Sequence, residues 1–337
     1  MNPLFNYQNE IQRKKEQREL RFLSNSGALT LLAFSAIAML ISSFVFYVPS
    51  LSERCFESTG FYLSFDLICS FIYLFLPFLV LYSIYKKRDA NARISFEFPK
   101  KKKYVALYFF AGMAFCMIGS YISAFFIGFI ETSTKTEFVY ELFSTPSKTD
   151  IFGRIIYIIR LVVFPALVEE FAIRGVIMIP LRKYSDTFAI FMSSLMFALM
   201  HGNMVQLPFA FIAGFALAYV VIATDSIWPA IFIHMGNNSI SVIQSFILED
   251  YPEAELFILI PIFAFIVLGI ASTIILFSKK ELPIQLAKNR TSIPTKVAVK
   301  KYLTTPAMII AIVYMLISTL LQSDKGMELM RKIAEII

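Results

Sequence analysis

Charged residues are scarce in this chain, and histidine, cysteine and tryptophan are scarcer still. Only 16% of the 337 residues are Asp, Glu, Lys or Arg, and the chain has two histidines, three cysteines and one tryptophan. Soluble domains carry about 25% charged residues. Together with 58% hydrophobic residues and a mean hydropathy of +0.68, this scarcity excludes an ordinary soluble globule and predicts an integral membrane protein.

The few cysteines exclude a disulfide framework and a cysteine-rich metal centre. Cys69 and Cys116 fall within apolar runs and Cys55 lies between two runs, so no pair has metal-ligand spacing. The first apolar run follows 26 residues of mixed charge and is not followed by a small-residue cleavage site, so we expect it to be retained. Because the sequence ends in AEII, we do not expect the chain to be a prenylation substrate itself.

What the chain does have is a series of long apolar runs. A helix that crosses a hydrocarbon core about 30 Å thick needs roughly 20 residues. We find no internal repeat and no soluble domain between the runs. The sequence therefore predicts an all-α fold, a polytopic transmembrane helix bundle with about nine spans, eight being the alternative count. The spans are 27–48, 62–85, 104–130, 151–180, 187–204, 206–223, 227–247, 256–277 and 303–321.

The orientation follows from the lysines and arginines, which cytoplasmic loops retain. With the N-terminus inside, the predicted inner segments hold 22 of the 31 basic residues, the outer segments hold 6, and 3 lie in the fourth span. We expect a cytoplasmic N-terminus and an outer C-terminus. Because the +7 net charge comes from clusters beside the membrane, at 86–103 and 279–301, it favours an anionic leaflet and not nucleic acid as a partner.

Four parts are expected along the chain. They are a cytoplasmic basic segment (1–26), three accessory spans (27–150), a catalytic helical core (151–247) and further accessory spans with an amphipathic tail (248–337). Met327, Met330 and Ile333 lie at helical spacing in that tail, which we expect to anchor at the outer surface. A short interfacial helix is predicted around 137–143 in the longest outer loop.

The fourth span contains an unusual group of charges in the stretch VEEFAIRG, residues 168–175. Ionised groups in lipid cost a few kcal/mol each, so they mark either a site or a structural ion pair. Glu170 and Arg174 are four residues apart and can pair on one helical face. Glu169 is turned about 100° away and has no such partner, and desolvation would favour its use as a general base. Asp66 and Arg160 are further buried charges that either pair or lie near an interface.

Both histidines fall within spans close to these carboxylates. His201 is in FALMH, and His234 is followed four residues later by Asn238 on the same helical face. A single histidine in an apolar span is more often a satisfied core residue, but two of two beside a buried glutamate favour a shared polar cavity. A carboxylate and an imidazole can activate water, while a second imidazole and an amide stabilise an oxyanion.

Two chemistries are compatible with this set of residues. One is hydrolysis of an amide without a metal, and the other is an open zinc site made of two histidines and a glutamate. Because the sequence lacks HExxH and an asparagine suits an oxyanion better than zinc, we favour the metal-free reaction, with no cofactor.

The motifs resemble those of a known family. EEFAIRG (169–175) is similar to EExxxR, FALMH (197–201) to FxxxH, and HMGNN (234–238) to HxxxN/B of the CPBP family, the CAAX proteases and bacteriocin-processing enzymes also called the ABI family of intramembrane glutamate proteases. The segment AGFALAYVVIATDSIWPAIFIH, with its Gly-containing span and Ser-Ile-Trp-Pro-Ala turn, also resembles the family. The resemblance covers residues 151–246, and the order and spacing of the motifs make it specific.

This resemblance implies roles for individual residues. Glu169 would be the catalytic base, acting with His201 on the attacking water, and His234 with Asn238 would form the oxyanion site. Glu170 and Arg174 would position the first glutamate. The family resemblance also implies a cavity within the membrane, which for prenyl-protein members opens toward the cytosol.

The sequence leaves the substrate open. The family covers CAAX prenyl protease type 2 activity on prenylated proteins, maturation of secreted or signal peptides, and self-immunity to bacteriocins. We expect a metal-independent endopeptidase in the plasma membrane of a bacterium, acting on a peptide or protein presented at the bilayer. The alternatives are a bacteriocin immunity or binding protein without catalysis, a zinc-dependent protease, and an ion-coupled transporter, which would usually show an internal repeat.

Overall fold

The computed structural model describes residues 3–88, 94, 96–138 and 144–334, and its regular elements in those ranges are all helices. A single isolated antiparallel bridge, between Phe138 and Ser323, is the described β pairing. The predicted all-α class is therefore confirmed. The described part of the predicted 137–143 helix is limited to Glu137 and Phe138, since 139–143 lie outside the described residues.

The N-terminal third of the chain forms long helices interrupted by a tight corner. These helices are α1 (Pro3–Tyr47), α2 (Pro49–Glu57), α3 (Thr59–Ser70), the π-helical segment η1 (Phe71–Phe75), α4 (Leu76–Arg88), the short 3-10 turn η2 (Lys102–Tyr104) and α5 (Val105–Thr134). Helix α1 runs without a break through residue 27, where the sequence predicts the first span to begin.

The middle of the chain contains one long helix in which two π-helical segments interrupt the α-helical hydrogen bonding. Its parts are α6 (Ile151–Ile158), the π-helical η3 (Ile159–Val163), α7 (Phe164–Glu170), the π-helical η4 (Phe171–Met178) and α8 (Ile179–Leu181). The next helices are α9 (Asp186–His201), α10 (Leu207–Thr224) and α11 (Trp228–Asp250). The chain ends with η5 (Pro252–Ile258), α12 (Leu259–Ser278), α13 (Thr295–Leu303), α14 (Pro306–Leu321) and α15 (Asp324–Ala334).

By length and composition, 6 described helices could cross a membrane, or up to 7 if the bent pair α13 and α14 is one span. The predicted count of nine is not confirmed. Helix α9 is shorter, with 16 residues. Helix α11 has 23 residues but is not among the six, because its histidine and asparagines lower its hydropathy. Two of the nine predicted spans thus have no counterpart among these helices. They correspond to α9, which carries His201, and α11, which carries His234.

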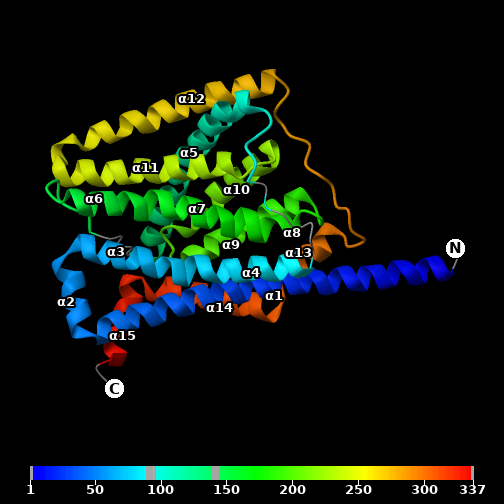
Figure 1. Cartoon of the computed structure of the whole chain (residues 1–337), viewed down its shortest axis with the longest axis horizontal. Helices are drawn as coiled ribbons and strands as arrows, with labels where there is room; N and C mark the ends of the chain where they lie inside the picture. The colour runs from blue at the N-terminus through cyan, green and yellow to red at the C-terminus, as the bar shows by residue number, and fades with distance from the viewer. Residues whose placement is uncertain (1–2, 89–93, 95, 139–143, 335–337) are drawn as a thin grey trace.

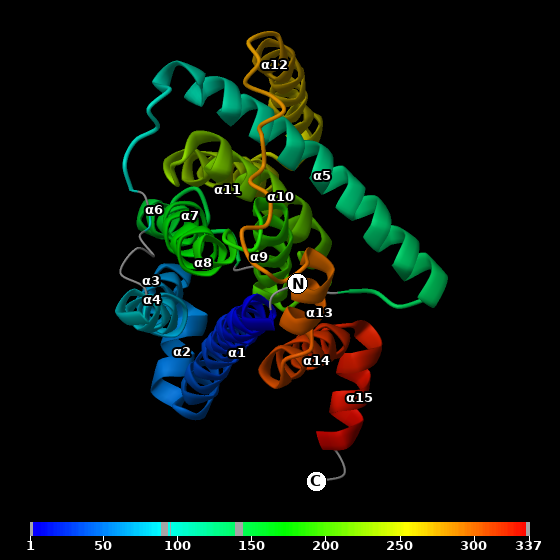
Figure 2. The same ribbon diagram turned by 90° about the vertical axis from the view of Figure 1, so that its right-hand side faces the viewer.

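Figure 2 shows α9 and α10 in the middle of the bundle, with α6 to α8 and α11 beside them. Helix α3 packs against α6, while α1 packs against α13 and α14. On the other side, α5 crosses obliquely and contacts α10, α11 and α12. The central helices are thus shielded by neighbours, which explains how less apolar helices can lie within the bundle.

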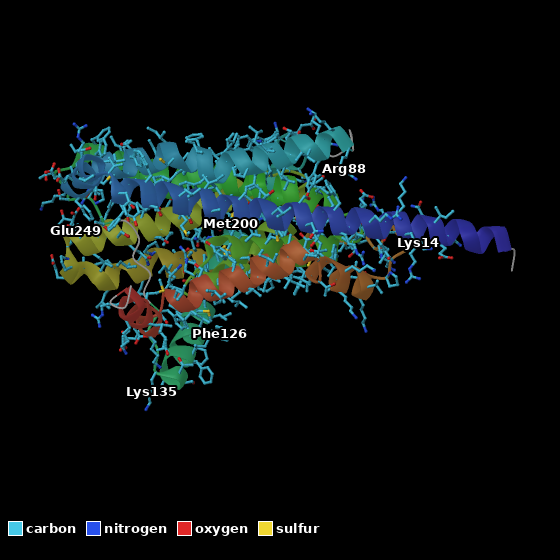
Figure 3. All side chains as sticks on the ribbon, turned by 90° about the horizontal axis from the view of Figure 1, so that it is seen from below. Lys14, Arg88, Phe126, Lys135, Met200 and Glu249 are labelled. Carbon is cyan, nitrogen blue, oxygen red and sulfur yellow. The ribbon has the colours of Figure 1, made fainter. Side chains whose placement is uncertain are left out.

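The ends of the helices are sorted as the sequence predicts. At one end, Glu16 of α1 accepts hydrogen bonds from the backbone N–H and hydroxyl of Ser292, at 2.8 and 2.6 Å, and Tyr184 Oη donates to the Glu16 carbonyl at 2.9 Å. At the other end, Arg154 pairs with Asp250 at 2.5 Å. Figure 1 shows α8 and α13 at the end near the N-terminus, and Figure 3 places Arg88 and Lys14 opposite Glu249. These predicted inner segments therefore lie together at one end of the bundle, and these predicted outer segments lie at the other end. Which end faces the cytoplasm stays a prediction.

Small residues on α10 allow close contact with α9. Ala210 and Ala218 are buried, and a Cβ at Gly214 would lie only 3.0 Å from the Cα of Ser194. This face of small residues lets the two helices approach closely. This contact fixes α10 beside the helix that carries His201.

The tail forms the predicted helix. Helix α15 leaves Met327 and Met330 about half exposed, while the side chain of Ile333 lies outside the described residues. The backbone N–H of Asp324 donates to the Glu137 carbonyl at 3.0 Å, and Asp324 Oδ1 accepts from the Glu137 N–H at 3.1 Å. The tail helix is thus tied to the chain that follows α5, and its anchoring at a membrane surface stays a prediction.

Candidate active site

The two adjacent glutamates lie at a change of helix type. Helix α7 begins with Pro165 in its first turn and ends at Glu170, where the π-helical segment η4 takes over. A π-helical turn is wider than an α-helical turn and is often found at functional sites. The irregular backbone is buried in the middle of the bundle, where neighbouring helices can satisfy its polar groups.

Glu170 is sealed inside the protein and holds two partners on one oxygen. Its Oε1 accepts from Arg174 Nη1 at 3.0 Å and faces His234 Nδ1 at 2.9 Å. The Glu170 and Arg174 side chains are both 0% exposed. The pair predicted from the four-residue spacing is therefore confirmed. Because a carboxylate only accepts, the proton in the second contact belongs to His234 Nδ1.

The Glu170–Arg174 pair also has two polar atoms that make no hydrogen bond to the described residues. Glu170 Oε2 and Arg174 Nε are buried and have no hydrogen-bond partner among the described residues. Arg174 Nη2 donates to the Gly214 carbonyl at 3.4 Å, and the guanidinium lies over the Phe197 ring, 4.5 Å from its centroid. Buried polar atoms without partners are costly, and a catalytic role is one of the reasons for which a protein retains them.

Glu169 is the more accessible of the two carboxylates. Its side chain is 14% exposed, and its Oε2 lies 3.9 Å from His234 Nε2, beyond hydrogen-bond distance. The ring of His234 therefore lies between the glutamates, with Nδ1 bonded to Glu170 and Nε2 directed at Glu169. The structure brings both glutamates, Arg174 and His234 into one cluster.

His201 approaches this cluster from α9 across an aromatic ring. His201 Nδ1 lies 2.8 Å from the Phe197 carbonyl, which only accepts, so Nδ1 carries the proton and Nε2 is left available. The Phe197 ring centroid is 4.8 Å from that of His201 and 5.9 Å from that of His234. In the described contacts, Glu169 faces His234 and not His201, so the joint action of Glu169 with His201 stays a prediction.

The amide of Asn238 is fixed at both ends. Its Nδ2 donates to the Leu161 carbonyl at 2.9 Å, and its Oδ1 accepts from Asn237 Nδ2 at 3.3 Å. In an α-helix the Leu161 carbonyl would accept from residue 165, but Pro165 has no N–H to donate. The asparagine of α11 supplies a donor to that carbonyl, so Pro165 and Asn238 act together at this point.

Three contacts thus join α11 to the helix that carries the glutamates. From one end of the bundle to the middle they link Asp250 to Arg154, Asn238 to the Leu161 carbonyl, and His234 to Glu170. The partners run in opposite directions along the two helices, as antiparallel neighbours require. This brace sets the position of His234 relative to both carboxylates.

Several residues of the site could not be assigned from the sequence. Phe197 was visible only as the first letter of FxxxH, yet its ring contacts both histidines and Arg174. The carbonyls of Leu161 and Gly214 carry no sequence signal of their own. For the Leu161 carbonyl, a signal that could have found the contact is Pro165, which has no N–H to donate to a carbonyl one turn earlier.

Outside this cluster, the buried charges Asp66 and Arg160 pair with each other, which confirms the first of the two interpretations. Within the described ranges, no group of three or more His, Cys, Asp and Glu side chains is arranged to hold a metal ion.

Residues 151–240 match the family model described as Type II CAAX prenyl endopeptidase Rce1-like. The match begins at the first residue of α6 and ends within α11, so it contains every residue of the cluster. No curated protein and no solved structure matches the chain. The family resemblance predicted from the motifs is confirmed, and it points to a protease embedded in a membrane.

Proposed function

We propose that this chain is an intramembrane endopeptidase that cleaves a membrane-presented peptide or protein without a metal. The match of residues 151–240 to the Rce1-like family model supports this proposal. The observation that carries the proposal is the cluster of Glu169, Glu170, Arg174 and His234 inside the matched segment. It places one reachable carboxylate beside an imidazole whose other nitrogen is already bonded.

In the proposed reaction Glu169 is the general base. It removes a proton from a water molecule as the water oxygen attacks the carbonyl carbon of the scissile amide. Glu169 is suited to this role because it is partly exposed, whereas Glu170 is sealed and occupied by Arg174 and His234. The same proton then passes to the leaving nitrogen as the carbon–nitrogen bond breaks. His201, with its free Nε2, assists Glu169 in holding the water.

His234 and Asn238 are proposed to stabilise the oxyanion. With a proton on each nitrogen, His234 donates to Glu170 through Nδ1 and presents an Nε2–H to the reacting centre. Two carboxylates, one guanidinium and one imidazolium are then neutral together, which lowers the cost of burying them. The Asn238 amide donates one of its two protons to the Leu161 carbonyl, and the other is proposed to donate to the oxyanion.

The direct test compares peptides from cells that express wild type, Glu169→Gln, or the exposed-surface control Glu53→Gln at equal membrane levels. Mass spectrometry should find a cleavage product with wild type and with the control, and none with Glu169→Gln. Such a product names the substrate and distinguishes prenylated proteins from precursor peptides. If a phenotype of the wild type persists in Glu169→Gln with no change in peptides, the binding or immunity function replaces the enzymatic one.

A second experiment separates the metal-free reaction from the zinc alternative. Purified protein is treated with a strong chelator and then supplied with zinc, using the substrate found in the peptide comparison. We expect unchanged cleavage after both steps. Activity that is lost with the chelator and restored by zinc would establish the zinc-dependent mechanism.

A further inference from the structure

A second polar cluster lies between the accessory helices and the matched segment. Arg160 of η3 donates through Nε to Asp66 of α3, and through Nη2 to the Tyr73 hydroxyl of η1 at 2.8 Å. The Tyr73 hydroxyl donates to the other oxygen of Asp66 at 3.1 Å. Asp66 and Tyr73 therefore hold the guanidinium of Arg160 from two directions. Both lie outside residues 151–240.

The clamped residue is the immediate neighbour of the carbonyl that holds Asn238. Arg160 and Leu161 lie in the same five-residue π-helical turn, η3 (Ile159–Val163). The Leu161 carbonyl accepts from Asn238 Nδ2 at 2.9 Å. Leu63 of α3 packs with Val162 and with Val242 of α11 in one buried cluster, so the same three elements also meet through apolar contacts.

We propose that Asp66 and Tyr73 are positioning residues for Asn238, acting through Arg160 and the π-helical turn that presents the Leu161 carbonyl. The proposal rests on the function proposed above for Asn238. It states that the accessory helix formed by α3 and η1, outside the family segment, sets the geometry of the oxyanion site.

The physical basis is the local weakness of the helix at this point. A π-helical turn is rare and occurs mostly as a single turn that interrupts an α-helix, as η3 does here. Pro165 removes a donor just beyond it. The side chain of Arg160 is the polar contact by which α3 and η1 restrain this turn, and a shift of about 1 Å in a positioning group can cost about 100-fold in rate.

A purely structural ion pair predicts something different. Its loss would lower the amount or the melting temperature of the folded protein and leave the surroundings of Asn238 as they are. A positioning role predicts that Asn238 responds in protein that remains folded.

The experiment observes Asn238 directly and needs no substrate. The protein is labelled with ¹⁵N-asparagine and held in lipid nanodiscs, and the Asn238 side-chain amide signals are identified by their loss in Asn238→Asp. Asp66→Asn combined with Arg160→Gln removes both charges, so neither is left unpaired. We expect this double variant to shift the Asn238 signals by more than their line width. Tyr73→Phe, which keeps the ion pair, is expected to give a smaller shift in the same direction.

The matched control is Ser64→Ala, since Ser64 lies on α3 beside Asp66 and its hydroxyl donates within its own helix, to the Gly60 carbonyl at 2.7 Å. The control should leave the Asn238 signals in place. Unchanged signals in both folded test variants would overturn the proposal. If the double variant does not fold, Tyr73→Phe alone decides.

An activity measurement then separates this proposal from the proposed function. With the substrate from the peptide comparison, we expect Tyr73→Phe to lower kcat about tenfold with KM changed less than twofold, and Asp66→Glu to recover more activity than Asp66→Asn. If the Asn238 signals shift but Asn238→Ala has wild-type activity, the positioning holds and the catalytic role of Asn238 fails.

Discussion

Two buried arginine–carboxylate clusters lie in this bundle, and they differ in whether their carboxylate oxygens all accept hydrogen bonds. In the cluster of Asp66, Tyr73 and Arg160, both carboxylate oxygens accept hydrogen bonds from the other two members. In the cluster around Glu170 and Arg174, one carboxylate oxygen and the guanidinium Nε have no partner among the described residues. The second cluster also has a neighbouring carboxylate, Glu169, that is partly exposed.

The difference distinguishes a bracing group from a reacting one. A bracing group lowers its free energy by keeping both of its carboxylate oxygens hydrogen-bonded. A reacting group must keep a base and donors available for the substrate and relies on its surroundings to tolerate them. Four measurements test this contrast, and we expect the size of the change to decrease from the first to the last.

The largest effect is expected on catalysis from Glu169→Gln. The change keeps the shape of the side chain but removes the base, and general-base catalysis contributes about 10²- to 10⁴-fold. We expect kcat to fall by that range while the melting temperature stays within a few degrees of wild type. The measurement is single-turnover cleavage of the identified substrate. A fall of less than tenfold would assign the base to another group.

The next effect is expected on stability from Arg174→Met. Removing the guanidinium leaves the buried cluster of Glu169, Glu170 and His234 with an unbalanced negative charge, which costs about 3–5 kcal/mol. The free energy of unfolding in detergent should fall accordingly. Glu170→Gln added to Arg174→Met should recover much of the loss, because the unpaired charge is gone. If the double variant is no more stable than Arg174→Met, the pair is not the source of the effect.

A smaller effect is expected from Gly214→Ala. The new Cβ would lie 3.0 Å from the Cα of Ser194, and overpacking of this kind costs about 1–3 kcal/mol. Since the Gly214 carbonyl accepts from Arg174, cleavage should fall with stability. The control is Gly128→Ala, where a Cβ would meet nothing within 4 Å. Equal melting temperatures for the two variants would contradict the close approach of α9 and α10.

The smallest effect is expected from Gln322→Ala, on the turn that follows His201. Gln322 Nε2 donates to the Gly202 carbonyl at 3.2 Å, and Gly202 ends α9 with a φ of 64°. Loss of one such bond costs about 0.5–1.5 kcal/mol. We expect a small drop in unfolding free energy and a modest loss of kcat, with KM unchanged. The control is Ser278→Ala, whose hydroxyl donates to its own helix, and a larger loss there would refute the link from α14 to His201.

The sequence was most informative where a short-range rule applies. Helical spacing placed Glu170 on Arg174 and turned Glu169 away, and both features are present. The same rule put His234 and Asn238 on one face of α11. Hydropathy identified a helical membrane protein but not the number of spans, because α9 and α11 are shielded by other helices and need not be uniformly apolar.

Contacts between distant parts of the chain could not be predicted. Spacing within one helix does not reveal which nitrogen of His234 meets which glutamate, or that Phe197 separates the two histidines. The donor from Asn238 to the Leu161 carbonyl joins residues 77 positions apart. Backbone acceptors carry no sequence signal. The sign of this contact in the sequence is Pro165, which has no N–H to donate to the Leu161 carbonyl.

The sequence alone predicts that this protein lies in a membrane, that it is helical, and which ionisable side chains it contains. These properties follow from composition and from the periodicity of neighbouring residues. Only the tertiary structure decided which carboxylate is sealed and which is reachable, since that depends on how α9, α10 and α11 pack around the π-helical segment η4. The physical reason is that exposure and hydrogen-bond partners are properties of neighbouring helices, and packing alone brings those neighbours together.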